Sequence, residues 1–227
     1  MTVKAIVTDI EGTTSSIDFV HKVLFPYATR ELPAFVRSSH EHPEVAALLD
    51  DVRNEAEEFD ASIDRVIEIL LNWISEDRKA TSLKAIQGHV WRHGYEHGDF
   101  TGHMYDDAVD RLRRWSQMGI DLYVYSSGSV GAQKLIFGYS DAGDLRPLFR
   151  DYFDTRIGHK KDAASYSNIV NAINVPAGEV LFLSDVAEEL DAAAEAGMLT
   201  TQLVRQDDVV VGSHSVAADF NEVIIDQ

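Results

Sequence analysis

The stretch VKAIVTDIEGTT, residues 3–14, places two carboxylates directly behind a short apolar run. Residues 3–7 are mostly apolar, which is typical of a buried strand. Asp9 and Glu11 follow at the carboxyl end of that strand, and Gly12 permits a tight turn behind them. Because side chains alternate along an extended chain, Asp9 and Glu11 are expected on the same side of it. The stretch therefore predicts a buried strand that delivers two acids to one place.

Further strands of the same character predict the fold class. The five expected strands are residues 4–9, 121–126, 152–157, 179–185 and 200–205. Helical patterns lie between them, at residues 104–118, 129–138, 162–174 and 186–196. Apolar strands that alternate with helices indicate an α/β fold, a doubly wound parallel sheet covered on both faces. The tail, residues 206–227, is ambiguous, because DDVVVG (residues 207–212) reads either as a loop or as an edge strand.

Residues 19–100 interrupt this alternation with helical periodicity alone. They predict about four helices, and Pro26 is expected to kink or restart the first. We therefore predict an α/β core domain, residues 1–18 and 101–227, and an inserted helical cap domain, residues 19–100. An insert after the first strand is expected above the carboxyl edge of the sheet, where α/β proteins bind ligands, and so to serve as a lid.

Charge and composition narrow the classes of partner. The 227 residues carry 20 Lys and Arg against 38 Asp and Glu, a formal charge of −18. Such a surface repels nucleic acid and anionic membranes, so neither is expected as a partner. No apolar run approaches the roughly 18 residues of a membrane span, and the opening stretch does not read as a signal peptide. The absence of cysteine excludes disulfides and fits a cytoplasmic protein.

The paired acids of the first strand suit phosphorus chemistry. A carboxylate such as Asp9 can attack phosphorus and form an acyl-phosphate. A second carboxylate, Glu11, can protonate the leaving group and then activate water. The alternative for an isolated D-x-E-G-T-T is an ordinary turn whose acids cap the next helix.

The ends of the other strands carry residues that complement these acids. Ser126 precedes a helix, where hydroxyl and N–H groups suit a phosphate, although a plain helix cap is the alternative. Lys160 and Lys161 follow the third strand, and one lysine aimed at the site would neutralise a phosphate, whereas surface lysines are usually solvated. Asp185 ends the fourth strand and completes, with the first two acids, an oxygen-rich set that favours Mg²⁺ over Zn²⁺.

In chain order, Asp9, Ser126, Lys160 and Asp185 resemble the four motifs of the haloacid dehalogenase superfamily of aspartate-nucleophile phosphatases. Most phosphatases of that superfamily have D-x-D-G-T, and this chain has Glu11 instead. The D-x-E-G-T-T variant resembles the acireductone synthases, the enolase-phosphatase family of methionine salvage. Further blocks are similar to that family as well: FVHKVLFPYA (19–28), GHVWRHGYEHG (88–98), GHMYDDA (102–108), YSSGSVGAQKLIFGYS (125–140) and FDTRIGHKKDAASY (153–166).

The resemblance implies a role for each acid of the site. Asp9 would be the nucleophile and a Mg²⁺ ligand. Glu11 would be a second ligand and the general acid and base. Asp185 would be the third protein ligand.

The resemblance also implies how substrate is held. Ser126 and Ser127 would bind it through the phosphate and neighbouring oxygens. Lys160 would contact the phosphate and stabilise charge on Asp9, and it is preferred to Lys161 because the family lysine follows the His of GHK.

The reaction that this family carries out converts 2,3-diketo-5-methylthiopentyl 1-phosphate to the acireductone, first by enolisation and then by loss of phosphate. The resemblance further implies a monomer that acts on a small phosphorylated diketone. Three alternatives remain: a capped Mg²⁺-dependent phosphatase of another small ester, a haloacid dehalogenase, and a non-catalytic binding module with a phosphatase-like fold.

The histidines have structural and chemical interpretations. Glu11 and His21 are both candidates to take the carbon-bound proton, although a packed or surface histidine is the favoured interpretation of His21. His89, His93 and His97 recur at a spacing that places them on one face of a helix, and histidines arranged in this way can bind a metal ion. Packing or exposure is favoured for these three, since glycine interrupts the helical pattern between them.

Overall fold

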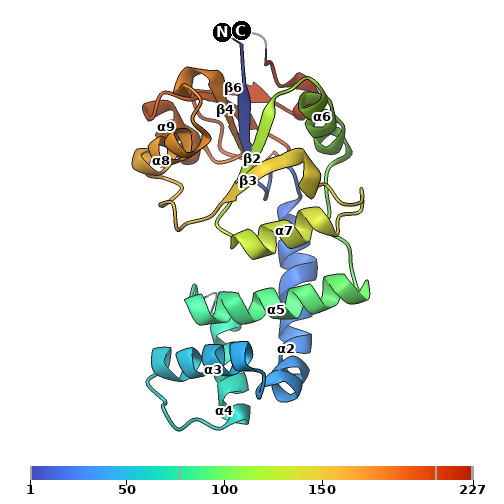
Figure 1. Ribbon diagram of the computed structural model, residues 1–227, viewed down its shortest axis with the longest axis vertical. Helices are drawn as coiled ribbons and strands as arrows, with labels where there is room; N and C mark the ends of the chain where they lie inside the picture. Colours follow the sequence, from blue (N-terminus) through green and yellow to red (C-terminus); the bar gives the residue numbers. More distant parts are fainter. Residues whose placement is uncertain (1, 77, 208, 226–227) are drawn as a thin grey trace. The chain divides into compact units, whose positions relative to one another are not determined.

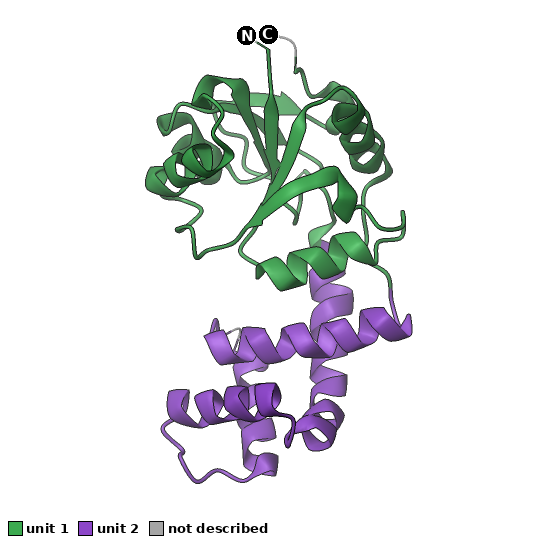
Figure 2. Cartoon of the chain, in the orientation of Figure 1, with its two compact units in different colours: residues 1–17, 101–227 green, residues 18–100 purple. Residues whose placement is uncertain are grey.

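The computed structural model describes residues 2–76, 78–207 and 209–225 and divides into two compact units. One unit comprises residues 1–17 and 101–227, and the other comprises residues 18–100 (Figure 2). The first unit is built on a sheet and the second is helical, so a helical unit is inserted into an α/β unit. The predicted fold class is confirmed.

The sheet unit contains six parallel strands in the order β3-β2-β1-β4-β5-β6 (Figure 1). The strands are β1 (Ala5–Thr8), β2 (Asp121–Tyr125), β3 (Phe149–Phe153), β4 (Val180–Ser184), β5 (Leu199–Leu203) and β6 (Ser215–Ala217). The order runs outward from β1 in both directions, so the topology switches direction beside β1. Crevices at the carboxyl ends of strands at such a switch are where open α/β sheets bind ligands.

Helices cover both faces of this sheet. They are α6 (Asp106–Gln117), α7 (Val130–Gly138), α8 (Ala163–Ile173) and α9 (Ala187–Glu195). Figure 1 shows α8 and α9 on one side of the sheet and α6 on the other. Ala5 and Val7 of β1 pack into the cluster formed with α8 and α9, and every residue of β1 is buried. Burial on both faces explains why this strand is a continuous apolar run.

The third strand differs from the prediction. Residues 152–157 were expected, but β3 is Phe149–Phe153 and residues 154–157 form a turn that the Ile157 N–H closes on the Asp154 carbonyl. Arg150 and Asp151 are exposed within β3. Charged residues are tolerated there because β3 is at the edge of the sheet, and these charges hid the start of the strand.

The C-terminal tail, residues 206–227, contains an edge strand, but this strand lies outside the DDVVVG segment. DDVVVG, residues 207–212, forms no strand in its described residues, and residue 208 lies outside them. The edge strand is β6, three residues long, and it pairs with β5 from Thr201 opposite Ser215 to Leu203 opposite Ala217. A segment this short carries too little periodicity to be found in the sequence.

The helical unit is a bundle with a core of its own. Its elements are α1 (Ile17–Phe19), whose first residue belongs to the sheet unit, a π-helical turn (Val20–Leu24), α2 (Phe25–Ser39), α3 (Pro43–Glu55), α4 (Ile63–Ser75) and α5 (Thr81–His97). Leu32, Leu49, Leu70 and Ile86, from four helices, are each fully or almost fully buried in one cluster. The four long helices match the number expected.

Pro26 restarts the first helix of this unit, as predicted. It lies in the first turn of α2, where the missing N–H is tolerated. The turn before it is widened, since the Phe25 N–H bonds back to the Val20 carbonyl, five residues earlier.

The histidine series lies on α5, which continues through Gly94. A side chain at Gly94 would meet Phe100 at 2.5 Å and Tyr27 at 2.7 Å, so glycine serves close packing here. His89 packs against Phe35, and the rings of His93 and His97 stack with centroids 4.0 Å apart. His89 is thus partly buried, whereas His93 and His97 are exposed.

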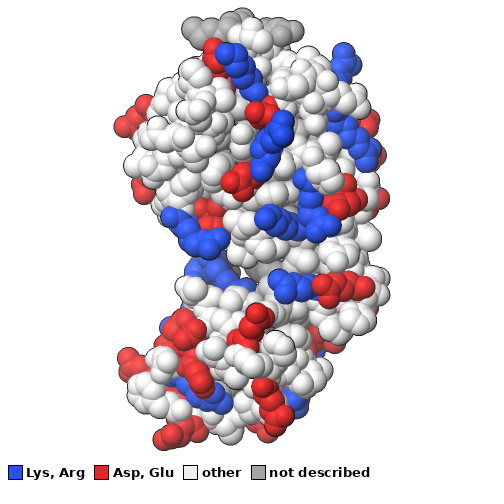
Figure 3. All heavy atoms as spheres, in the orientation of Figure 1, with Lys and Arg blue, Asp and Glu red and all other residues white. Residues whose placement is uncertain are grey.

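Charges of both signs are interspersed on the visible face of each unit (Figure 3). In the helical unit, Arg65 lies between Glu58 at 2.8 Å and Glu68 at 2.9 Å. No helix in the described part of the chain is long and apolar enough to cross a membrane.

A partly buried ion pair clamps several segments of the sheet unit together. Arg205, just after β5, makes two hydrogen bonds to the carboxylate of Asp107, at 2.7 and 3.1 Å. Its Nε donates to the Thr13 carbonyl at 2.8 Å, and its guanidinium lies 3.9 Å from the ring centroid of Tyr105. The Phe220 N–H donates to the same carboxylate at 2.8 Å. Arg205 thereby fixes the loop behind Glu11.

We predict that Asp107→Asn lowers the free energy of unfolding by about 2–3 kcal/mol at pH 7, because a charged hydrogen-bond acceptor is lost. Burial alone would raise the pKa of Asp107, but the hydrogen bonds from Arg205 and Phe220 lower it below its ordinary value. A lowered folded pKa gives stability above the unfolded pKa of about 3.9, and that stability is lost as pH falls through the folded pKa. Urea titrations from pH 7 to pH 3 should therefore show that the difference in free energy of unfolding between wild type and Asp107→Asn shrinks below about pH 4.

Asp110→Asn is the matched control, because Asp110 is exposed on the same helix. It should change the free energy of unfolding by about 0.5 kcal/mol or less. A deficit for Asp107→Asn that stays constant down to pH 3 would contradict the role of the ion pair.

Candidate functional site

The predicted acids lie at the topological switch of the sheet. Asp9 directly follows β1, and its N–H donates to the Leu183 carbonyl of β4 at 2.9 Å. Asp185 directly follows β4. Because β1 and β4 are hydrogen-bonded neighbours, their ends bring Asp9 and Asp185 to the same edge.

The loop behind Asp9 is a compact turn around one carbonyl. The Ile10 carbonyl accepts the N–H groups of Thr13, Thr14 and Ser15, at 3.2, 2.9 and 2.9 Å. The Thr14 hydroxyl donates to the Asp9 carbonyl at 3.1 Å. These bonds hold the main chain on both sides of Glu11, so the turn orients the two acids.

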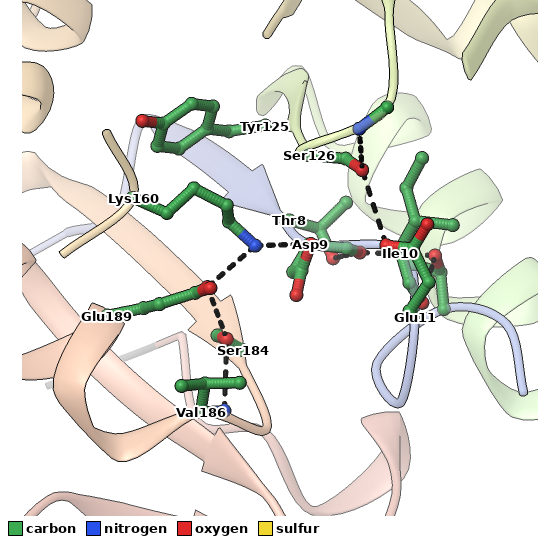
Figure 4. Close-up of polar contacts among 12 residues, drawn as sticks. Thr8, Asp9, Ile10, Glu11, Tyr125, Ser126, Lys160, Ser184, Val186 and Glu189 are labelled. Carbon is green, nitrogen blue, oxygen red and sulfur yellow. Dashed lines mark hydrogen bonds and ion pairs between the residues drawn. The ribbon is translucent and has the colours of Figure 1, made fainter. Parts of the chain in front are cut away.

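Lys160 reaches Asp9 from the loop after β3. Its Nζ lies 2.7 Å from Asp9 Oδ1, and both side chains are buried (Figure 4). The Tyr166 hydroxyl donates to the Lys160 carbonyl at 2.7 Å and fixes the main chain there. Lys161, by contrast, is half exposed and lies 3.5 Å from Glu188. Of the two lysines, only Lys160 points at Asp9.

Glu189 is a site residue that the sequence analysis missed. It lies in the first turn of α9, and its Oε2 is 2.7 Å from the same Lys160 ammonium (Figure 4). The Ser184 hydroxyl donates to Oε2 at 3.0 Å. The available signal was an acid four residues after Asp185 on a helix that starts at the sheet edge. An acid in a first helical turn is common, so the signal is weak.

The serine loop approaches from β2. Ser126 is fully buried, donates through its hydroxyl to Glu11 Oε2 at 3.2 Å and accepts the Gly128 N–H at 3.1 Å. Ser127 is exposed in the same loop. The structure thus joins Ser126 to Glu11, and it places Ser127 beside them in the chain with its side chain open to solvent.

The electrostatics of the site favour an added cation. Burial, and then the charge of Asp9, raise the pKa of the Glu11 carboxyl. The same two causes raise the pKa of Asp185 to about 7 and that of Glu189 to about 7. Burial alone would lower the pKa of Lys160, but the charges of Asp9 and Glu189 outweigh it and raise that pKa. The acids therefore repel one another even with the lysine among them.

The residues present fit a hard divalent cation. Asp185 Oδ1 is buried and has no hydrogen-bond partner among the described residues. Gly12, at φ +74°, leaves room for this carboxylate, because a Cβ there would lie 2.2 Å from Asp185 Oδ2. Oxygen donors without sulfur or imidazole favour Mg²⁺.

The acids nevertheless form no closed ligand set in the described structure. Asp9 Oδ1 meets Lys160, and Glu11 Oε2 meets Ser126. A cation would compete with these contacts for the carboxylates.

Comparisons with known proteins show the family of this chain. The model of the haloacid dehalogenase-like hydrolases matches residues 3–197. Enolase-phosphatase E1 of Pseudomonas aeruginosa (strain UCBPP-PA14) is 58% identical over 226 residues, 100% of both chains. Enolase-phosphatase E1 of Erwinia tasmaniensis is 53% identical over 97% of this chain and 96% of its own.

Among solved structures, the UTR4 protein of Saccharomyces cerevisiae aligns with a TM-score of 0.84 and 35% identity. It covers 97% of this chain and 100% of its own. CbbY of Rhodobacter sphaeroides, at 16% identity and a TM-score of 0.60, shows the same fold.

We predict that Gly12→Ala weakens Mg²⁺ binding by at least about 10-fold, because the new Cβ displaces a carboxylate from the candidate metal site. It should also cost about 1–2 kcal/mol or more of stability for a side chain at positive φ. Calorimetric titration with Mg²⁺ and thermal unfolding measure the two effects.

Gly119→Ala separates the two causes. Gly119 lies in the same unit at φ +83°, and a Cβ added there would have no atom within 4 Å, so the substitution imposes similar backbone strain only. Mg²⁺ affinity should be unchanged in this variant. Equal losses of affinity in both variants would show that backbone strain, and not the approach to Asp185, is responsible.

Proposed function

Since this chain belongs to the enolase-phosphatases of the haloacid dehalogenase-like hydrolase family, we propose that the site at the β1 and β4 ends carries out both steps of its reaction. The substrate is 2,3-diketo-5-methylthiopentyl 1-phosphate, and the products are the acireductone, 1,2-dihydroxy-5-methylthiopent-1-en-3-one, and phosphate. The reaction belongs to methionine salvage. The observation that carries the proposal is the buried contact of 2.7 Å between Lys160 Nζ and Asp9 Oδ1.

Asp9 acts as the nucleophile in the phosphatase step. A carboxylate oxygen of Asp9 forms a bond to phosphorus while the bond from phosphorus to the substrate oxygen breaks. Lys160 stabilises the negative charge on Asp9 and on the phosphoryl oxygens. Water then attacks phosphorus in the acyl-phosphate, which releases phosphate and restores the Asp9 carboxylate.

Glu11 acts as the general acid and base. The raised pKa of the Glu11 carboxyl favours its protonated form closer to neutral pH and makes its carboxylate a stronger base. As the acid it protonates the departing substrate oxygen, and as the base it takes a proton from the attacking water. In the enolisation it takes the proton from the carbon beside the carbonyl, for which His21, packed edge-on against Phe25 in the helical unit, is the other candidate.

The remaining roles of the site residues are to bind the substrate and the cation. Ser126 and Ser127 bind the phosphate and neighbouring oxygens at the start of α7, where N–H groups favour an anion. Asp9, Glu11 and Asp185 would hold Mg²⁺, which when bound would stabilise negative charge on the substrate oxygens as a Lewis acid and offset phosphate charge.

The family and the net charge also suggest the role of the helical unit, the location of the protein and its partners. The helical unit, predicted as residues 19–100, is the cap domain that the family resemblance implies. The protein acts as a cytoplasmic monomer on a small phosphorylated diketone, and a charge of −18 disfavours nucleic acid and anionic membranes as partners.

Asp9→Asn should abolish phosphate release while the enol still forms, because the amide is a poor nucleophile. We expect a loss of about 10³-fold or more in the release rate. Enol absorbance and free phosphate are followed in parallel with the diketone phosphate and Mg²⁺. Phosphate release at the wild-type rate in Asp9→Asn would refute the nucleophile assignment.

Lys160→Met should lower kcat for phosphate release by about 10²–10³-fold, because a buried positive charge is lost beside the reacting phosphoryl group. Lys161→Met is the matched control, since its neighbouring ammonium is exposed. The control should retain activity within about twofold, as expected of a surface change. Equal losses in both variants would contradict the choice of Lys160.

A further inference from the structure

A buried amide lies beside the candidate metal site. Gln202 is on β5, opposite Ser184 of β4, and is fully buried. Its Nε2 donates to the Asp185 carbonyl and to the Val210 carbonyl, each at 2.8 Å. Its Oε1 accepts the Gly212 N–H at 2.8 Å. Burying the Gln202 amide costs little free energy because it makes all of these hydrogen bonds. Its loss would leave two carbonyls and an N–H unpaired.

These partners fix which way the amide points. Two carbonyls require the donor end of the amide, and one N–H requires the acceptor end. The Asp185 carbonyl therefore always faces the NH₂ group of Gln202. Turning the amide over would place its oxygen against the carbonyl oxygens of Asp185 and Val210. Gln202 has one orientation, set by main-chain groups on two different segments.

The segment that supplies Val210 and Gly212 is itself anchored. A Cβ on Gly212 would lie 2.9 Å from Ala187 Cβ, so the segment packs closely on the start of α9. His214 hydrogen-bonds through Nδ1 to the Thr200 hydroxyl at 2.9 Å and through Nε2 to Asp191 at 3.0 Å. Gln202 thus connects Asp185 to a segment that is fastened to β5 and to α9.

The carbonyl that Gln202 holds belongs to the residue whose carboxylate is proposed to bind Mg²⁺. Asp185 lies past the last residue of β4, where strand hydrogen bonds no longer fix the chain. Fixing its carbonyl fixes the peptide plane that leaves its Cα, and so restricts the direction of its side chain. The carboxylate itself has an unpartnered oxygen and needs this support from the main chain.

We propose that Gln202 is a positioning residue for the metal site, which acts by holding the Asp185 main chain so that its carboxylate faces the cation. This inference rests on the proposed function, because it takes Asp185 as a Mg²⁺ ligand. It assigns a part in metal affinity to the segment after β5, through the Val210 carbonyl and the Gly212 N–H that bond to Gln202.

The test is calorimetric titration of the full-length protein with Mg²⁺, which needs no turnover. Gln202→Met keeps the volume and removes all three hydrogen bonds, and it should weaken Mg²⁺ binding about 10-fold or more. Saturating Mg²⁺ should restore most of kcat in this variant, whereas a general loss of folded protein would lower kcat at every Mg²⁺ concentration. If Gln202→Met fails to fold, Gln202→Asn keeps a buried amide that is one methylene too short, and the same loss of affinity is expected.

Thr200→Val is the matched control. It breaks the His214 anchor on the same strand and leaves the Asp185 carbonyl bonded. It should retain most of the Mg²⁺ affinity that Gln202→Met loses, because it loosens the anchor of the segment but does not break the bond to the Asp185 carbonyl. Wild-type affinity in the folded Gln202 variant, or an equal loss in Thr200→Val, would overturn the positioning role.

Asp185→Asn distinguishes failure of the inference from failure of the proposed function. If wild-type protein binds Mg²⁺ and Asp185→Asn binds it equally well, Asp185 is no ligand and the proposed metal site is wrong at its premise. If Asp185→Asn loses binding while Gln202→Met retains it, the metal site stands and only the role of Gln202 is refuted.

Discussion

A single buried ammonium holds the site together. Lys160 lies between Asp9 and Glu189 at 2.7 Å from each, in surroundings that leave all three side chains at most 10% exposed. A charge buried in this way is strongly unfavourable alone and becomes acceptable only when its partners are in place. The end of β1, the loop after β3 and the first turn of α9 must therefore come together as one set. A surface ion pair would impose no such condition.

The sequence was sufficient for the central strands and insufficient at the edges. β1, β2 and β4 are buried on both faces, or nearly so, and their apolar runs are visible without knowledge of the fold. β5, with the sequence LTTQL, was found from its β-branched residues. β3 was misplaced by three residues at its start because an edge strand can carry Arg150 and Asp151. β6 was missed because three residues show no periodicity. In both cases the information that decides the structure lies in the position of the strand within the sheet.

The candidate site divides in the same way. Asp9, Glu11 and Asp185 could be predicted because each ends an apolar run. The choice of Lys160 over Lys161 came from the family resemblance, since two adjacent lysines in a loop look alike. Glu189 and Gln202 could not be predicted from pattern, because their partners are distant in sequence: Glu189 meets residue 160, and Gln202 meets a carbonyl 17 residues away. Such roles depend on which strand ends and helices become neighbours.

The central place of β1 also has a consequence for biosynthesis. Ala5 pairs with Asp121 on one side and with Val180 on the other, so β1 has both of its neighbours encoded more than 100 residues later. The chain emerges from the ribosome at about 5–20 residues per second, and domains generally fold as units in the order of synthesis. The helical insert, which lies between β1 and β2, is complete before either neighbour of β1 exists. β1, an apolar strand that leads to Asp9, must therefore remain without a sheet partner until β2 has been made.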